Sequence, residues 1–377
     1  MRVEYIRKSR EQSGQAQIRL CIKAGTVQDV YGKEGTAHVL EHVNLLFDKL
    51  GMYGSRFNFI ASGYTDFYNT TYIFRIDDEI LYIYRVLEII NRILNGWFIE
   101  KFDINLAKKD IKEEIRKILP NPIVTKIIKN SELERKDPRN RKIDIDNINR
   151  DDIYQYYKKN YLRSNCLLLI KSGIEKREID EGINLIISRN EEISVERNCF
   201  FLNWEKEKYE DSNNFNKIIF KVPKMVEQNK YNFWEAKWIQ WMFELCFIKL
   251  FETKANEARV SEILFSPYEF LFSINGWNFD DCNDLIKKML HVFRQYMKWI
   301  SEDRFLQKFI DYSRERSLVD TIVLREKEYI YNRKLTLDKE NSSFKVIKNL
   351  NIDKLRLQFE NTLSTENILL LKCNSDK

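Results

Sequence analysis

The stretch GTAHVLEHVNLLF at residues 35–47 limits what this chain can fold into more than any other. It contains two of the three histidines found in 377 residues, and they lie four positions apart. No proline or glycine interrupts the stretch after its first residue; Thr36 suits an N-cap and Gly51 a C′ position, so the pattern predicts a helix. Four residues are about one helical turn, which places His38 and His42 on one face.

Glu41 directly precedes the second histidine and completes the inverted zinc signature H-x-x-E-H. Two neutral imidazoles on one helix face supply half of a tetrahedral zinc site, and Glu41 lies close enough to take a proton from water there. The alternative is a buried histidine pair with a structural role. Histidine is so scarce here that the motif would arise from composition alone on the order of a few times in a thousand. We therefore favour a zinc site.

A second predicted helix, Ile104–Leu119, supplies a candidate third ligand. Asp103 would cap it and Pro120 would end it. Glu114 falls on its apolar stripe, whereas Glu113 falls on the polar face. A buried carboxylate needs a partner, and a zinc ion would be one; the alternative is a glutamate at the edge of the stripe that reaches solvent. The stripe consists of Ile104, Ala107, Ile111, Ile115 and Ile118.

The remaining pattern of the first half alternates predicted strands with predicted helices. Residues 2–8 and 16–24 are expected to form paired strands joined by a turn at Ser13 and Gly14. Further strands are expected at Phe57–Ala61, Thr70–Ile76 and 165–170, with helices at Ile80–Asn95, ended by Gly96, and at Ile153–Tyr161.

The second half repeats this plan in coarse outline. We expect strands at Lys217–Val222, Tyr268–Ile274 and Ile368–Lys372, and helices at Trp234–Phe251, Asp280–Ile300 and Asp303–Asp311. A shift in composition at EEISVERN, residues 191–198, is typical of a linker region. The fold class predicted is therefore α+β, with domains at residues 1–185 and 186–377.

Composition narrows the class of protein further. Net charge is +6, but lysines and arginines are spread along the chain beside nearly as many acids, which disfavours nucleic-acid binding. Six cysteines form no C-x-x-C pair, so a disulfide or thiolate framework is not expected. The first residues hold no apolar signal segment and no run is long enough to span a bilayer, so we expect a cytoplasmic protein.

Three motifs together resemble the pitrilysin/insulinase-type metallopeptidases, the group that includes mitochondrial processing peptidase. They are GTAHVLEH at 35–42, similar to the family's G-x-A-H-x-x-E-H; YTDFYNTTY at 64–72, similar to a strand motif A-y-T-x-x-x-x-T-x-Y; and DIKEEI at 110–115, which looks like the helix of the distal zinc glutamate. The run YLRSNCLLLIKSG ending at Gly173 also resembles the close of the family's first domain. The resemblance is specific over residues 16–173.

The resemblance implies a fold of two related α/β-sandwich halves, each a mainly antiparallel sheet packed with helices, which form half of a clamshell. It implies one Zn²⁺ per chain, held by His38, His42 and Glu114, with Glu41 as general base of an endopeptidase. It also implies a heterodimer with a second related chain, with a homodimer as the alternative. A small peptide precursor in a maturation pathway would suit a half-length chain of this kind.

The same resemblance places peptide binding at a sheet edge near Ala61, Ser62, Gly63 and Tyr64, where small residues would let another backbone come close. From the residues alone, an ordinary loop with a glycine turn is the alternative for this stretch.

The chain departs from the family pattern at two places. The family often has another glutamate where this chain has Ala107. In the second half, Arg259 is the nearest candidate for an arginine that binds substrate, but Phe265 and Ser266 stand where its tyrosine partner would, and Tyr268 comes too late. These departures fit a division of labour in which a partner chain supplies the arginine and tyrosine.

Two classes of function besides an active peptidase stay open on the sequence. One is a non-catalytic scaffold subunit and the other a carrier that grips extended peptides without cutting them. His291 has no neighbours at ligand spacing and is interpreted as structural. Trp234, Trp238 and Trp241 share one helix face, for which core packing is favoured over a partner surface.

Overall fold

The computed structural model describes residues 1–8, 14–52, 59–117, 128, 132–138, 144–187, 215–223, 233–250, 259–265, 270–279, 282–300, 303–317, 321–331 and 351–371. The chain forms two compact units, Met1–Leu202 and Asn203–Lys377. The last helix of the first unit runs to Ile186, so the boundary predicted at 185/186 falls inside its final turn. Residues 188–214 lie outside the described ranges, and the position of the boundary therefore stays a prediction.

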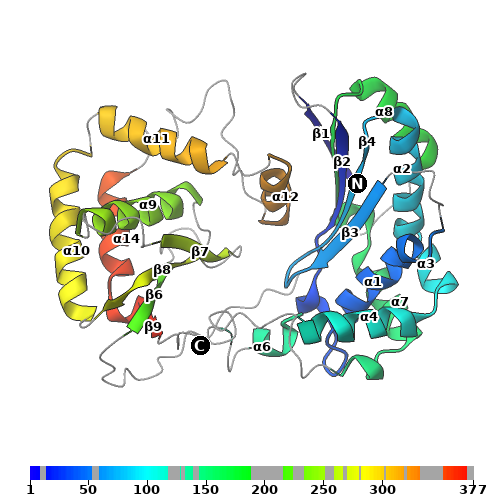
Figure 1. Cartoon of the computed structure of the whole chain (residues 1–377), viewed down its shortest axis with the longest axis horizontal. Helices are drawn as coiled ribbons and strands as arrows, with labels where there is room; N and C mark the ends of the chain where they lie inside the picture. Colours follow the sequence, from blue (N-terminus) through cyan, green and yellow to red (C-terminus); the bar gives the residue numbers. More distant parts are fainter. Residues whose placement is uncertain are drawn as a thin grey trace. The chain divides into compact units, whose positions relative to one another are not determined.

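Unit 1 consists of one five-stranded sheet and its helices (Figure 1). Its strands are β1 Arg2–Arg7, β2 Gln15–Ile22, β3 Phe59–Thr65, β4 Thr70–Asp77 and β5 Cys166–Ser172. Its helices are η1 Thr26–Gln28, α1 Thr36–Lys49, α2 Ile80–Leu94, α3 Trp97–Lys101, α4 Ile104–Lys117, α6 Glu132–Lys136, η2 Ile145–Asn147, α7 Arg150–Asn160, η3 Arg163–Asn165 and α8 Lys176–Ile186.

The order of strands corrects one prediction. The sheet runs β1-β5-β2-β4-β3, so β1 does not pair with β2 as expected but lies parallel to β5, which separates the two. The sequence of β5 is apolar at five consecutive positions, which suits a central strand with neighbours on both sides. The first strand has exposed arginines at both ends, Arg2 and Arg7, which suits an edge. The other pairs are antiparallel, as predicted.

The helices of unit 1 cover one face of this sheet, and the core lies between the two layers (Figure 1). Alternate residues of β4, among them Tyr72 and Phe74, are fully buried, as the two-residue period of a strand requires. On α1 the side chains of Val39, Val43 and Phe47 are fully buried. Burial of each such side chain contributes about 1.5–3 kcal/mol to stability, so packing against the sheet stabilises the position of the helix that carries the histidines.

Unit 2 repeats the topology of unit 1. Its antiparallel sheet runs β7-β8-β6-β9, which corresponds strand for strand to β3-β4-β2-β5, with a long helix between β2 and β3 in unit 1 and between β6 and β7 in unit 2. The predicted α+β fold of two related halves is thus confirmed. The strands are β6 Phe215–Val222, β7 Arg259–Phe265, β8 Phe270–Phe279 and β9 Ile368–Leu371, and the helices α9 Phe233–Leu250, α10 Cys282–Met297, α11 Asp303–Ser317, α12 Thr321–Tyr331, α14 Ile352–Thr362 and η4 Thr365–Asn367.

The sequence predicted most, but not all, of the unit 2 elements. Helix α11 is longer than expected, and β7, α12 and α14 were not predicted. Trp238 and Trp241 of α9 are buried in the unit 2 core, as predicted, while the side chain of Trp234 lies outside the described set. The predicted linker at 191–198 also lies outside it.

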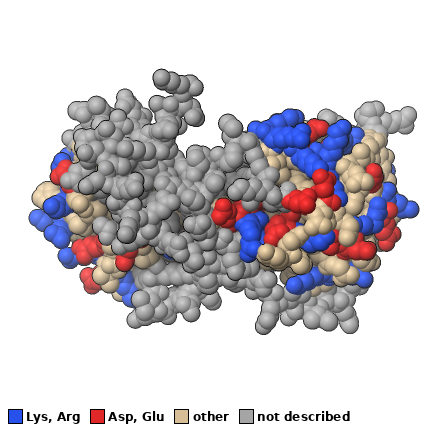
Figure 2. Space-filling model, turned by 90° about the horizontal axis from the view of Figure 1, so that it is seen from below, with Lys and Arg blue, Asp and Glu red and all other residues tan. Residues whose placement is uncertain are grey.

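The surface carries charges of both signs. Figure 2 shows acidic and basic side chains interspersed over the described surface of each unit in that view, with no unit covered by one sign alone. Among the helices that the structure describes, none has the length and apolar character needed to cross a bilayer. Cys21, Cys166 and Cys246 are buried and form no disulfide.

Candidate metal centre

A buried carboxylate from the preceding loop fixes the start of α1. Gly35 is the N-cap, with φ +94°, and Thr36 is the first helical residue, so the prediction of Thr36 as N-cap is wrong. The Asp29 carboxylate accepts hydrogen bonds from the backbone N–H groups of Gly35 (2.7 Å) and Ala37 (2.9 Å), which satisfies two of the helix's free donors. Sequence reasoning missed Asp29, because it lies six residues before the cap rather than at it.

The end of α1 matches the prediction. Gly51 follows the C-cap Leu50 with φ +61° and its N–H donates to the carbonyl of Asp48, while that of Met52 donates to Phe47. This pair of hydrogen bonds is a Schellman motif, which closes a helix with a left-handed residue at C′. Both ends of the histidine helix are therefore held by defined hydrogen bonds.

The structure brings the three predicted ligands together. His42 Nε2 lies 3.1 Å from Glu114 Oε2, and His38 Nε2 lies 3.8 Å from the same oxygen. Ligands about 2.1 Å from a tetrahedral zinc are about 3.4 Å apart, so these separations bracket the value a zinc site needs. Helix α4 thus presents Glu114 to α1, whereas its neighbour Glu113 is exposed, as the periodicity predicted.

Glu41 lies beside these groups but at a greater distance. It is 3% exposed, and one of its oxygens lies 3.9 Å from His38 Nε2. Its carboxylate and the two imidazoles form a group whose ligand atoms all lie within 4.8 Å of one another. Glu114 and Glu41 lie almost equally far from His38 Nε2, at 3.8 and 3.9 Å, so it is the 3.1 Å contact of Glu114 with His42 Nε2 that favours Glu114 as the ligand. Glu41 then stands next to these three side chains.

Burial and neighbouring charge perturb every titratable group of this cluster. Burial, aided by the charge of His42, lowers the pKa of His38 to about 4, and a hydrogen bond with the Pro138 backbone opposes this. For His42, burial lowers the pKa, but the hydrogen bond with Glu114 and the charge of Glu41 outweigh it and raise the pKa. Burial raises the pKa of Glu41 to about 7, and the hydrogen bond with His42 lowers that of Glu114. Perturbations of this kind are typical of functional sites.

The donor set suits zinc. His38 Nε2 faces Glu114, so the ring's other nitrogen, Nδ1, is the one that bonds the Pro138 backbone. Nε2 is then unprotonated in the neutral ring and available as a metal ligand. Ligating histidines in zinc proteins are oriented in the same way by an acceptor on the far ring nitrogen. Two imidazole nitrogens and one carboxylate, with space for a further group, are the ligands of catalytic zinc sites.

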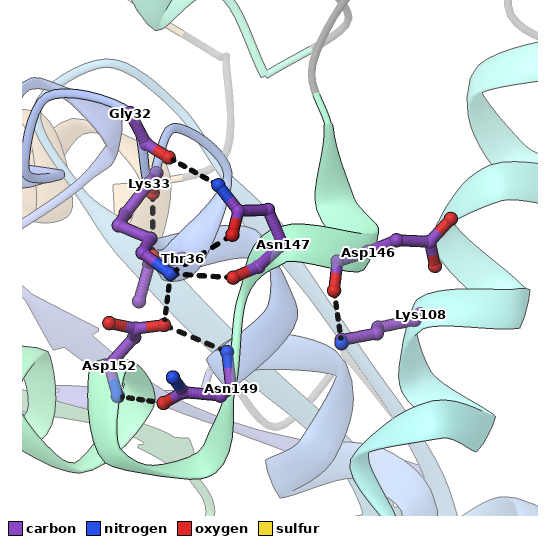
Figure 3. A network of polar contacts seen from close by, with 8 residues as sticks. All are labelled: Gly32, Lys33, Thr36, Lys108, Asp146, Asn147, Asn149 and Asp152. Atoms are coloured by element: carbon purple, nitrogen blue, oxygen red, sulfur yellow. Dashed lines mark hydrogen bonds and ion pairs between the residues drawn. The ribbon is translucent and has the colours of Figure 1, made fainter.

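One short segment braces both helices of the centre (Figure 3). Lys33, which precedes α1, donates to the Asn147 backbone carbonyl (2.6 Å) and pairs with Asp152 (2.9 Å). Lys108 of α4 donates to the backbone carbonyl of Asp146 (3.1 Å), and Lys112 pairs with the carboxylate of Asp146. The η2 segment therefore contacts both α4 and the residues that lead into α1.

The stretch predicted to bind substrate lies in an edge strand. Residues 61–64 belong to β3, which continues to Thr65 rather than ending at Ala61, so the alternative of a loop with a glycine turn is wrong. Among the described strands, β3 pairs only with β4. The side chains of Ile60 and Tyr64 are 54% and 39% exposed, while Gly63 faces the Glu41 carboxylate.

The structure describes the side chains of Ala107 and His291, but not those of the second-half residues considered for substrate binding. Ala107 is buried in the core on α4, so no carboxylate extends the centre from that position. His291 lies on the exposed face of α10, where its Nε2 bonds Gln295. Ser266 and Tyr268 lie outside the described residues, as do the side chains of Arg259 and Phe265.

Comparison with known proteins agrees with this picture. Residues 4–138 match the model of the family described as Insulinase (Peptidase family M16). The probable zinc protease PqqL of Haemophilus influenzae is 24% identical over 212 residues, which are 50% of this chain and 22% of that protein. The chain therefore accounts for only part of that relative's length.

Solved structures show the same fold. The first half of the periplasmic protease PqqL from Escherichia coli has a TM-score of 0.70 at 15% identity, and the match covers 97% of this chain and 88% of that one. In the whole E. coli protease the match (TM-score 0.65, 15% identity) covers 94% of this chain and 44% of that chain. A peptidase M16 domain described as inactive, from Pseudomonas fluorescens, has a TM-score of 0.59 at 12% identity over 98% and 94% of the two chains.

Proposed function

Because residues 4–138 match the model of the insulinase family (peptidase family M16), which the sequence motifs also resemble, we propose that this chain is a zinc-dependent endopeptidase. The observation that carries the proposal is the convergence of His38, His42 and Glu114, with the buried Glu41 beside them. A fold alone would not support an activity, since relatives of the same fold include a domain described as inactive.

His38, His42 and Glu114 would hold one zinc ion. When bound, zinc would act as a Lewis acid toward a peptide carbonyl and lower the pKa of water toward neutrality. Glu41 would take the proton from the attacking water and pass it to the amine that leaves. Its burial places this proton transfer in a site of low dielectric constant, where such interactions are stronger than in water.

The edge strand β3 would hold the substrate. An extended peptide can add to the free edge of a sheet by backbone hydrogen bonds, and β3 is such an edge among the described strands. Ala61, Ser62, Gly63 and Tyr64 would then form the strand's contact with substrate, and the small residues leave room for a second backbone. We therefore propose that the substrate is an extended peptide, such as a precursor cut in a maturation pathway.

A non-catalytic scaffold subunit is the second candidate function. The P. fluorescens domain favours it in principle, because the same fold occurs there in a domain described as inactive. The complete set of His38, Glu41, His42 and Glu114 argues against it, since a scaffold or a peptide carrier has no need of a buried base beside three ligands.

The test is the conservative change Glu41→Gln. It is nearly isosteric and removes only the proton acceptor, so zinc content should stay near that of the wild type. Proton transfer by a positioned side chain is worth about 10²–10⁴-fold, and turnover of a fluorogenic peptide should fall by at least that much. Wild-type protein loaded with zinc that binds peptides without cutting them, alone and with a related partner chain, would instead support the scaffold or carrier.

A further inference from the structure

The carboxylate of Glu41 is held by the edge strand rather than by its own helix. The hydroxyl of Thr65, the last residue of β3, donates a hydrogen bond of 3.0 Å to Glu41 Oε2. Glu41 is 3% exposed, so water does not offer an equal replacement for this donor. The hydrogen bond joins two elements 24 residues apart, α1 and β3.

The position two residues earlier on β3 adjoins the other oxygen of the same carboxylate. Residues two apart on a strand face the same side, so Gly63 and Thr65 both face α1. A Cβ added at Gly63 would lie 2.6 Å from Glu41 Oε1 and 3.0 Å from Leu45 Cδ1. A side chain at position 63 would therefore require the Glu41 carboxylate to shift from the place where Thr65 holds it.

This contact matters because the Glu41 carboxylate could otherwise move toward the two histidines. One of its oxygens lies within 4.8 Å of a donor nitrogen of each histidine, and Oε2 lies 3.9 Å from His38 Nε2. A carboxylate at that range could rotate toward a cation and become a ligand, and it would then no longer serve as a base. Oε2 is also the oxygen that accepts from Thr65, so this hydrogen bond would have to stretch or break before Oε2 moved closer to the histidines.

We propose that Thr65 is a positioning residue that holds Glu41 as a base beside the centre, in a space that Gly63 leaves open. The proposal rests on the proposed peptidase function for its kinetic consequence, but the contact itself does not. It also gives β3 two tasks: its free edge would bind the peptide and its inner face aims the base. One strand would therefore position both the substrate and the base.

Kinetics of three variants test the role. Thr65→Val keeps the shape and removes the donor, so kcat should fall about 10- to 100-fold, the worth of a hydrogen bond to a charged group, with little change in KM or zinc content. Thr65→Ser restores the hydroxyl and should recover most of the loss. Thr70→Val is the matched control: Thr70 pairs with Thr65 on β4, but its hydroxyl donates to the Ala24 carbonyl, and kcat should change little.

Stability measurements test the contact without any assay of activity. In metal-free protein, Thr65→Val should lower Tm more in the wild-type background than in the Glu41→Ala background, because only the former has the acceptor. Equal losses of Tm in both backgrounds, or a kcat for Thr65→Val equal to that of the control, would overturn the proposal. If the wild type cuts no peptide, the proposed function fails, and the Tm comparison still decides whether Thr65 holds Glu41.

Discussion

Glu113 and Glu114 are adjacent on α4 but differ in surroundings, which gives a matched pair for testing the zinc ligands. Glu114 Oε2 lies 3.1 Å from His42 Nε2, whereas Glu113 is exposed. Glu114→Gln should reduce bound zinc, measured by metal analysis, from about one per chain to a small fraction, because three protein ligands are the usual minimum in catalytic sites. Glu113→Gln should retain the metal. His42→Ala should behave like Glu114→Gln; equal zinc in all variants would exclude this ligand set.

Asp29 makes stability depend on pH in a direction opposite to that of most acids. Burial raises its pKa to about 7, although hydrogen bonds from Ala37 and Gly35 and the charge of Lys136 lower it. An unfolded aspartate titrates near 3.9, so between about pH 4 and 7 the folded state binds the proton more tightly. The stabilisation from Asp29 is therefore complete below about pH 4 and is lost as pH rises toward 7.

Asp29→Asn should lower the free energy of unfolding by roughly 1–3 kcal/mol, because the amide oxygen can accept from only one of the two helix N–H groups that bond the carboxylate. It should also remove the Asp29 part of the pH dependence. Urea unfolding at pH 5 and pH 7 measures both effects: the stability difference between the two pH values should be smaller in the variant. The buried Glu41 contributes with the same sign, so the comparison is made against the wild type rather than against zero. An unchanged pH dependence would contradict the assignment.

Residue spacing was sufficient to predict that His38, Glu41, His42 and Glu114 lie close together, because all four lie on two helices whose period of 3.6 is visible in the sequence. The cap Asp29 was not predictable, since it reaches α1 through a turn of the loop before it. Thr65 belongs to a recognisable strand motif, but its hydrogen bond to Glu41 depends on how β3 packs against α1, which the motif does not show.

The turn between β3 and β4 depends on close backbone contact with η1. The N–H groups of Thr26 and Val27 donate to the carbonyls of Asp66 and Phe67, at 3.1 and 3.0 Å. A Cβ added at Gly25 would lie 2.1 Å from the Asp66 carbonyl oxygen, which is a backbone atom that cannot move aside alone. Strand β3, with Thr65 at its end, is thereby tied to the loop that precedes α1.

Gly25→Ala should therefore destabilise unit 1 by about 3 kcal/mol or more, beyond the usual range for an overpacked site. The matched control is Gly32→Ala, where an added Cβ meets no atom within 4 Å and only the positive φ of +78° adds a cost, roughly 1 kcal/mol. Denaturant unfolding compares the two. A loss at Gly25 no larger than that at Gly32 would show that the turn can move away from η1.

Strand and helix positions were largely predictable, but pairing was not. The period of two and the β-branched residues identify β2 and β4, whereas nothing local in β1 indicates that its partner lies over 160 residues later, at Cys166–Ser172. The same applies to β7, α12 and α14, whose local patterns did not separate them from loops.

The two repeated units differ in their chemistry. The second half contains a single histidine, His291, so a second H-x-x-E-H centre cannot form in it. The chain also matches less than half of the whole E. coli protease, 44% of its length. We propose that a second related chain completes the substrate site that unit 1 begins.

The isolated chain should accordingly cut peptides weakly or not at all. Holding a reactant in place can lower a reaction barrier by about 7–11 kcal/mol at the upper end. A chain with only part of the substrate site would lose part of this lowering. The measurement is the mass of the purified chain in solution, followed by peptide cleavage with and without a related partner chain. Full activity from a verified monomer would refute the two-chain assembly and leave the zinc chemistry intact.

The place of β5 between β1 and β2 has a consequence for synthesis on the ribosome. A chain grows at about 5–20 residues per second, so β1 emerges roughly ten to thirty seconds before the strand that it pairs with. Until residues 166–172 have left the exit tunnel, β1 and one side of β2 lack their neighbour, and the histidine helix can settle only on part of its sheet. The sheet of unit 1 is therefore completed late, when its last strand, β5, pairs with β1 and β2. A nascent chain halted before Cys166 would present the two open strand edges of β1 and β2 to chaperones.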